Sequence, residues 1–490
     1  MKHENSDRSE HNDHCVLRPT RVNHLAPSRK LVILFLIFFT ALGVRLLNWH
    51  DRRNEAAAVQ SSVVLNYKRQ AMLIRTNGIA SISDASSSTN DPDLLGHPLG
   101  YPILLSLIQR AFDESDTVTQ LVQIILDSLA AVIICLIAFQ LFPTAVGLIA
   151  GLLAAFAPQF SWNSILLLPD SVAALPILLA VFLILVARNR RQHPEQAASV
   201  GRLARYEGLL LILAAGALIG VSCWLRANAL LLAPFLALWF TINYKRGERL
   251  RPALVLVGGA FLIIAPLTIR NSLVFGKFIP LSLGGGQTLI EGIADYDSDG
   301  SLGLPQTDME LIHREALTYQ RPDYAGSLFT PDGPARDRAR LSRGFAVVRA
   351  HPFWFASVMV RRAASMMRLE RTPLRLETTG TGGWPNLFLW PLRSVQRLFI
   401  TAIFLPLTLL GAGILTYERQ FQSLATLLVV PCYYFCFQSA LHTEYRYVLI
   451  IHYFFFVLAA VGIYTIACKL IHQIYSRKTS VSLNSSKRKS

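Results

Sequence analysis

The residues most suited to chemistry lie in the stretch Asp91–Pro102, in a polar segment between the first two apolar runs. Two carboxylates, an imidazole and a phenol fall within it: Asp91, Asp93, His97 and Tyr101. A carboxylate beside a membrane entry could act as general base on a hydroxyl. The same stretch could instead be only a rigid turn, since three prolines and two glycines restrict or shape it, ahead of an apolar helix too short to span a bilayer.

Further polar residues stand at the ends of apolar runs, and the predicted topology puts them all on one face. They are Asp51, Glu55, Asp170, Arg226, Arg270, Asn271, Glu444 and Arg446. Each alone could be a helix cap or a snorkelling anchor. Together, arginines can neutralise a phosphate and a carboxylate can take a proton, which favours transfer of a group from a lipid phosphate to an acceptor. Asp127 lies inside a predicted span, where a hydrogen bond between helices is expected.

The elements that must position these residues are membrane spans, since 52% of the 490 residues are hydrophobic and only 16% are charged. Ten apolar segments are predicted to span: 31–48, 118–142, 144–157, 170–187, 208–223, 227–242, 253–269, 397–416, 421–441 and 447–472. The net charge of +16 falls mostly in tails and loops beside spans, which argues against nucleic acid as a partner. The scattered histidines and cysteines show no metal-ligand spacing, so no cofactor is expected and a divalent metal is not indicated.

The distribution of Lys and Arg predicts the orientation. Basic loops at 188–205 and 245–251 and the basic tail 473–490 are expected in the cytosol, together with a disordered tail over 1–30. The expected organisation is then a transmembrane domain over 31–275 that carries the first external loop (49–116), an external region over 276–395, and C-terminal spans over 396–472. The active face would be non-cytosolic.

The apolar stretch 353–369 is long enough to span but carries arginines and serines at helical spacing: Ser357, Arg361, Ser365 and Arg368, with Arg362 beside them. Apolar side chains take the other sides, at Phe355, Val358, Met359, Met366 and Met367. We therefore expect an amphipathic helix that lies at the membrane interface and does not cross it.

The order of short motifs resembles that of the GT-C glycosyltransferases, and within them glycosyltransferase family 39. This family contains the dolichyl-phosphate-mannose protein mannosyltransferases and the bacterial lipid A aminoarabinose transferases. The matching segments are His97–Pro102, Leu167–Asp170, Trp224–Asn228, Ile269–Asn271 with Phe275-Gly276, His351-Pro352 and Arg446-Tyr447. They cover nearly the whole chain, and each is weak alone.

The resemblance implies an all-α multi-span membrane protein: a GT-C-like bundle of about ten transmembrane helices with external loops and an interfacial amphipathic helix. It also implies an inverting transferase in the plasma membrane, with a polyprenyl-phosphate sugar as donor and the catalytic carboxylate in the first external loop. The acceptor, a glycan, lipid or protein, stays open. Arg446, then Arg270, is the predicted contact of the donor phosphate, and Glu55, His97, Tyr101, Asp170, Arg226, Asn271 and Glu444 are further predicted substrate-binding residues.

One departure from the family concerns the base. The family carries an acidic pair a few residues before a tyrosine, but Val63 and Val64 precede Tyr67 here. Asp51, Asp91, Asp93 and Glu55 are left as candidates, with Asp51 favoured because it is nearest to the span. The departure is also compatible with an inactive or divergent member of the family. A multi-span transporter or a non-catalytic binding protein of the same fold would fit the same polar residues.

Overall fold

The computed structural model describes residues 27–78, 96–192, 201–371 and 384–487. Within these ranges every regular element is a helix, which confirms the predicted all-α class. Seven helices are long and apolar enough to cross a bilayer. They are α2 (Pro27–Ala58), α5 (Asp116–Leu141), α8 (Asp170–Gln192), α9 (Gly201–Leu225), α12 (Leu250–Phe275), α19 (Phe421–Phe437) and α20 (Leu449–Lys487).

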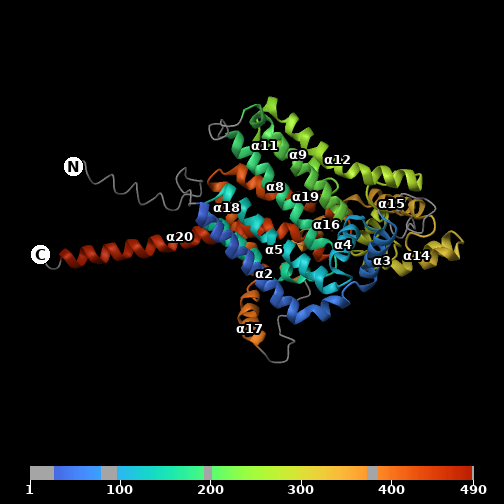
Figure 1. Ribbon diagram of the computed structural model, residues 1–490, viewed down its shortest axis with the longest axis horizontal. Helices are drawn as coiled ribbons and strands as arrows, with labels where there is room; N and C mark the ends of the chain where they lie inside the picture. Colours follow the sequence, from blue (N-terminus) through green and yellow to red (C-terminus); the bar gives the residue numbers. More distant parts are fainter. Residues whose placement is uncertain (1–26, 79–95, 193–200, 372–383, 488–490) are drawn as a thin grey trace.

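The other three predicted spans are helical but short or broken. They correspond to α6 (Thr144–Phe156), to α10 (Leu232–Ala237) with α11 (Trp239–Asn243), and to α18 (Thr401–Tyr417). A helix the length of α6 reaches only about 20 Å, less than the roughly 30 Å of a bilayer core. α17 (Trp384–Gln396) projects from the bundle (Figure 1) and precedes α18 at a bend of 58°. Length and composition therefore support seven crossings, or eight with this bent pair, against the ten predicted.

α8 lies at the centre of the bundle, where it packs on α5 and α9, and 72% of its apolar stretch is buried. α9 in turn packs closely on α12. A Cβ atom at Gly216 would lie 2.1 Å from the Leu256 carbonyl oxygen, and one at Gly259 would lie 2.4 Å from that of Leu213. Glycine thus allows the two backbones to meet, as in other membrane helix pairs. The first residue of α8 therefore has a fixed place between tightly packed helices.

The described parts of the region 49–116 are mostly helical. α2 continues to Ala58, and α3 (Ser61–Asn77) and α4 (Gly100–Phe112) follow and pack on each other. α4 agrees with the short apolar helix expected after the polar stretch, whereas α3 was not predicted. α3 buries Val64, Tyr67, Ala71 and Ile74, which recur every three or four residues among polar neighbours.

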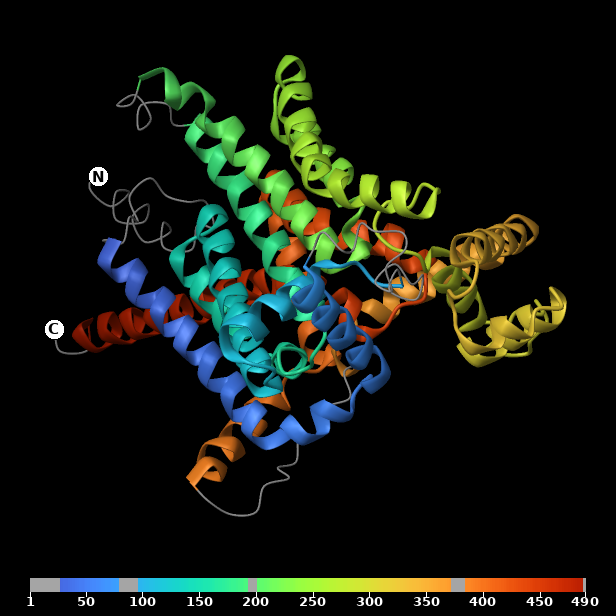
Figure 2. The same cartoon turned by 45° about the vertical axis from the view of Figure 1, so that its right-hand side comes forward.

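The second external region contains α13 (Gly285–Ala294), α14 (Asp308–Thr318), α15 (Gly333–Ala350) and α16 (Pro352–Met366). α13 packs against α15, and the yellow and gold helices of this region extend beyond the bundle in Figure 2. α3 and α4 lie toward this end in Figure 1, whereas α2 begins and α20 ends at the opposite end. This arrangement is the one that the predicted orientation requires, although which end faces the cytosol stays a prediction.

α16 is not among the helices that could span, in line with the prediction for 353–369. Phe355, Val358 and Met366 are buried as its apolar face requires. Arg362 departs from the expected pattern: it is buried, and its guanidinium donates to the carbonyl oxygens of Ser439 and Gly292. This arginine therefore joins α16 to α13 and to the end of α19, and the interfacial setting of the helix stays a prediction.

Candidate active site

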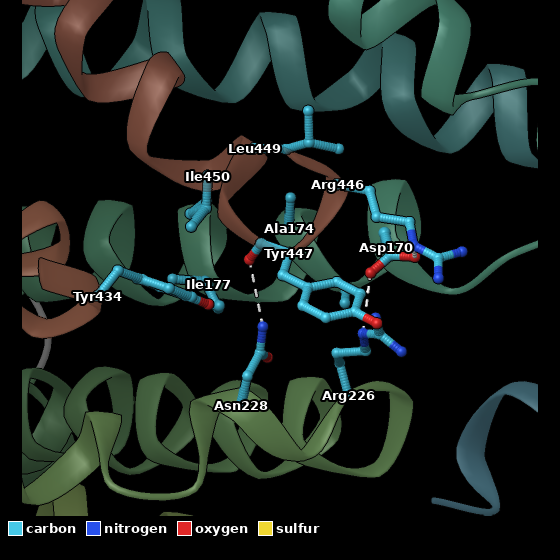
Figure 3. Close-up of a pocket in the computed structure, with 11 residues that line it drawn as sticks. Asp170, Ala174, Ile177, Arg226, Asn228, Tyr434, Arg446, Tyr447, Leu449 and Ile450 are labelled. Carbon is cyan, nitrogen blue, oxygen red and sulfur yellow. Dashed lines mark hydrogen bonds and ion pairs between the residues drawn. The ribbon is translucent and has the colours of Figure 1, made fainter. Parts of the chain in front are cut away.

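A polar pocket lies where the start of α8, the turn after α9 and the turn before α20 meet (Figure 3). Its lining residues are Asp170, Ala173, Ala174, Ile177, Arg226, Asn228, Tyr434, Arg446, Tyr447, Leu449 and Ile450. They come from four segments that are far apart in the sequence. Figure 3 shows Arg226 and Arg446 approaching the Asp170 carboxylate from two different elements.

Asp170 is the first residue of α8, where the helix dipole favours a negative charge. Its Oδ1 lies 2.8 Å from Nε of Arg226, and its Oδ2 lies 3.9 Å from Nε of Arg446. The carboxylate is buried, yet neither oxygen has a hydrogen-bond partner of good geometry among the described residues, and neither does Nε of Arg446. Buried polar atoms are nearly always hydrogen-bonded, so this group of unsatisfied atoms is where a polar ligand would be held best.

The two arginines are held by aromatic and acidic neighbours. The Arg226 guanidinium lies 4.0 Å from the centroid of the Tyr447 ring, a cation–π contact. Arg446 donates from Nη2 to Oε1 of Glu444 at 2.8 Å, and the Tyr447 hydroxyl donates to the same oxygen at 3.1 Å. Two guanidinium groups thus share one small site with two carboxylates, and Glu444 is the more exposed of the two acids.

The stretch at 97–102 supports this site from α4. The Tyr101 hydroxyl donates to Oε1 of Gln123 at 3.1 Å, and Nε2 of Gln123 donates to the carbonyl oxygens of Leu166 and Leu168 at 2.8 and 3.1 Å. These bonds fix the turn that leads into Asp170. Tyr101 is fully buried and positions this turn, and its predicted contact with substrate stays a prediction.

Gly100 supports the other side of the site. A Cβ atom at this position would lie 2.5 Å from the carbonyl atoms of Trp224, so only glycine lets α4 approach the residue two positions before Arg226. The His97 ring lies tilted against that of Tyr67, with centroids 5.0 Å apart. Burial, together with the charges of Arg226 and Arg446, lowers the pKa of His97 to about 3. The imidazole is therefore neutral at physiological pH.

Four predicted site residues lie elsewhere. Asp51 accepts a hydrogen bond from Nη2 of Arg393 at 2.8 Å, and Glu55 accepts from Arg52 at 2.8 Å. Arg270 donates to Asn271, whose amide donates to the Leu281 carbonyl oxygen. None of the four lines the pocket. Asp91 and Asp93 lie outside the described residues.

Sequence reasoning did not assign Gln123, Tyr434 or Tyr447 to the site. It used Tyr67 only as a marker of the family. A glutamine inside an apolar span is costly unless it is bonded, and this was the available signal for Gln123. Tyr447 follows Arg446 directly in a quoted motif. Among the described residues no group of three or more His, Cys, Asp or Glu side chains could hold a metal ion.

A separate apolar cavity of about 580 Å³ lies between α4, α8, α9 and α12. Its walls include Val172, two residues after Asp170, and Leu225, directly before Arg226. Gly100 and Trp224 line it as well. A molecule with an apolar chain and an anionic head could therefore place the chain here and the head at the arginines.

Comparisons with known proteins agree with this architecture. The family model described as dolichyl-phosphate-mannose-protein mannosyltransferase matches residues 96–269, a segment that includes His97, Asp170 and Arg226. No curated protein matches the sequence significantly. The matched segment covers about a third of the chain, so it marks a similarity over the first part of the site.

The solved structures that match include the oligosaccharyltransferase AglB from Archaeoglobus fulgidus in complex with an inhibitory peptide and a dolichol-phosphate. It has a TM-score of 0.52 and 17% identity, and the alignment covers 92% of this chain and 52% of that one. The apo form of the Archaeoglobus fulgidus oligosaccharyltransferase matches with a TM-score of 0.51 and 17% identity over 93% of this chain and 52% of that chain. The chain thus spans about half the length of these proteins.

ArnT from Cupriavidus metallidurans bound to undecaprenyl phosphate also aligns, with 16% identity over 84% of this chain and 78% of that chain. Its TM-score of 0.32 is too low to support an argument. The predicted resemblance to the GT-C glycosyltransferases is therefore confirmed in fold by the oligosaccharyltransferase structures and in sequence over residues 96–269 by the mannosyltransferase family model.

Proposed function

We propose that this protein is a membrane glycosyltransferase that moves a sugar from a polyprenyl-phosphate donor to an acceptor hydroxyl or amine. The observation that carries the proposal is the pair of arginines around Asp170, with an apolar cavity lined by their chain neighbours Val172 and Leu225. Arg226 and Arg446 would bind the donor phosphate, and the cavity would hold the first part of the polyprenyl chain. The dolichol-phosphate bound to the AglB oligosaccharyltransferase supports this class of donor.

In the proposed reaction the acceptor attacks the anomeric carbon from the face opposite the phosphate. The bond between that carbon and the phosphate oxygen breaks, the acceptor proton passes to a carboxylate base, and polyprenyl phosphate leaves with the electron pair. The arginines stabilise the charge that develops on the phosphate. The stereochemistry at the sugar is inverted, and the acceptor class stays open.

The base is proposed to be Asp91 or Asp93, which precede His97 by six and four residues. Asp51 is the weaker candidate, because its carboxylate accepts a hydrogen bond from Arg393 and does not line the pocket. Asp170 faces both arginines of the site, so its negative charge is needed to hold them in place. Its proposed role is to orient Arg226 and Arg446.

The experiment is turnover by the purified protein in lipid nanodiscs with a panel of polyprenyl-phosphate sugars. Release of polyprenyl phosphate, together with a glycosylated acceptor, is the expected result. Binding of polyprenyl phosphate without turnover of any donor would instead favour a non-catalytic binding protein. Equal binding of polyprenyl phosphate and polyprenol would overturn the proposed phosphate site.

The active face is proposed to be the non-cytosolic side of the plasma membrane. Ser301, which is exposed in the second external region, and Gly247, which is exposed in a basic loop, provide the test. A cysteine at 301 should react with an impermeant maleimide on intact cells, whereas a cysteine at 247 should react only after permeabilisation. The reverse pattern would invert the proposed orientation.

A further inference from the structure

Tyr67 carries a hydroxyl that the proposed reaction does not use. The side chain belongs to α3 and is 1% exposed. Its hydroxyl has no hydrogen-bond partner among the described residues. A buried hydroxyl without a partner is unfavourable and is rare in folded proteins, so its presence needs a reason.

The position of Tyr67 supplies that reason. It packs in one apolar cluster with Leu168, Leu225 and Tyr445. These three residues precede Asp170, Arg226 and Arg446 by two, one and one positions. The Tyr67 ring also contacts His97 and Tyr101, each at a centroid distance of 5.0 Å. The ring therefore belongs to the apolar cluster to which the segments that carry Asp170, Arg226 and Arg446 contribute.

We propose that the Tyr67 hydroxyl donates a hydrogen bond to the phosphate group of the bound polyprenyl-phosphate donor, beside Arg226 and Arg446. The inference rests on the proposed function and adds a third, uncharged donor to the phosphate site. Phosphate oxygens are strong acceptors, so they would satisfy a group that can donate. Burial raises the pKa of Tyr67, which keeps the hydroxyl protonated and able to donate at neutral pH.

Two other tyrosines near the site differ from Tyr67 in that their hydroxyls already donate hydrogen bonds within the protein. The Tyr101 hydroxyl donates to Gln123, and that of Tyr447 donates to Glu444. Both hydroxyls already have acceptors within the protein. Tyr101 is also buried and lies edge-on to Tyr67, so it provides a matched control for the loss of one oxygen atom.

The test compares Tyr67→Phe and Tyr101→Phe in the full chain in nanodiscs, with two probes: a polyprenyl phosphate that lacks the sugar, and the polyprenol of the same length. Tyr67→Phe should weaken binding of the phosphate roughly ten- to hundredfold, the usual value of a hydrogen bond to a charged group, and leave binding of the polyprenol unchanged. Its melting temperature without ligand should equal or exceed that of the unmodified chain. Tyr101→Phe should lower the melting temperature, because Gln123 loses a partner.

Each outcome decides for or against the inference. Unchanged phosphate binding by Tyr67→Phe, in a protein that does prefer the phosphate over the alcohol, overturns the inference and leaves the proposed function intact. A lower melting temperature with equal loss for both probes shows that the hydroxyl is structural, which also overturns it. If the unmodified chain has no preference for the phosphate, the proposed function itself fails.

Discussion

Two of the buried carboxylate–arginine pairs among the described residues, those of Asp127 and Asp170, differ in how their carboxylate oxygens are bonded. Oδ2 of Asp127 accepts from Nε of Arg45 at 2.6 Å, and Oδ1 accepts from the Tyr453 hydroxyl at 3.2 Å. Asp170 has two arginines beside it but no hydrogen bond of good geometry among the described residues. The first pair is completed by hydrogen bonds to both carboxylate oxygens, whereas Asp170 is held by ion pairs to Arg226 and Arg446, the second of them at 3.9 Å.

The comparison separates charges that join helices from charges that can serve a ligand. Asp127, Arg45 and Tyr453 connect α5, α2 and α20 in the middle of the bundle, which agrees with the predicted structural role of Asp127. Asp51 belongs to the same class, since Arg393 also donates to Asn48 and Gln396 and thereby attaches α17 to α2. Burial of charge alone is therefore not a sign of function here; what distinguishes Asp170 is that neither of its carboxylate oxygens accepts a hydrogen bond among the described residues.

Of the substitutions considered, Asp127→Asn should have the largest effect, and the quantity it should lower is the stability of the fold. The substitution leaves Arg45 buried without a counter-charge, which typically costs about 3–5 kcal/mol of the free energy of unfolding. Asp116→Asn in the same helix is the matched control, because Asp116 pairs with Lys68 at the surface and such pairs contribute at most about 1 kcal/mol. Equal stability of the two variants in a denaturation series would remove the distinction.

Replacing the different carboxylates of the first external region should change the turnover to different extents. We expect Asp91→Asn or Asp93→Asn to lower turnover by roughly two orders of magnitude, the usual contribution of a general base. Asp51→Asn should instead lower the melting temperature and leave the turnover of folded protein close to that of the unmodified chain. A stable but inactive Asp51→Asn protein would return the role of base to Asp51.

Arg446→Lys should weaken donor binding about tenfold, because lysine keeps the charge but loses the planar fork that binds two phosphate oxygens. Titration with a polyprenyl phosphate measures this effect. Arg349→Lys, at an exposed position of α15, is the control and should bind as the unmodified chain does. Equal affinity for both variants would mean that Arg446 contributes charge alone.

His97 should make a small contribution to the dependence of the free energy of unfolding on pH. Its pKa is about 3 in the folded protein and about 6.5 when unfolded, so the unfolded state binds more protons between these values. Stability is then complete above pH 6.5 and falls as the pH drops below it, by about 1 kcal/mol between pH 6.5 and 5.5. Melting temperatures of His97→Gln, measured over this range, should fall less than those of the unmodified chain. Parallel curves would show that His97 does not titrate in this way.

The sequence predicted the fold class and much of the site because those signals are local. Four charged residues of the site each stand at the end of an apolar run: Asp170, Arg226, Glu444 and Arg446. The packing of these runs brings their ends together around one pocket. The helix α3 was missed because its one buried row of apolar side chains lies among polar residues in the sequence.

The roles of single residues depended on partners that no local pattern shows. Asp51 and Arg393 are 342 positions apart in the chain, so nothing near Asp51 indicates that its carboxylate is occupied. Arg270 and Asn271 follow a span as Arg226 does, but they bond to each other and to the Leu281 carbonyl. The charged residues of this site all lie at ends of apolar runs, but that position alone does not identify which residues belong to the site.

The contact between Gly100 and Trp224 joins one wall of the apolar cavity to the chain segment that leads to Arg226. Both residues line the apolar cavity, and Trp224 is two residues from Arg226. Because backbone meets backbone there, α4 and the end of α9 have no compressible side chain between them. A larger side chain at position 100 would therefore displace the end of α9 and, two residues further on, the turn that carries Arg226.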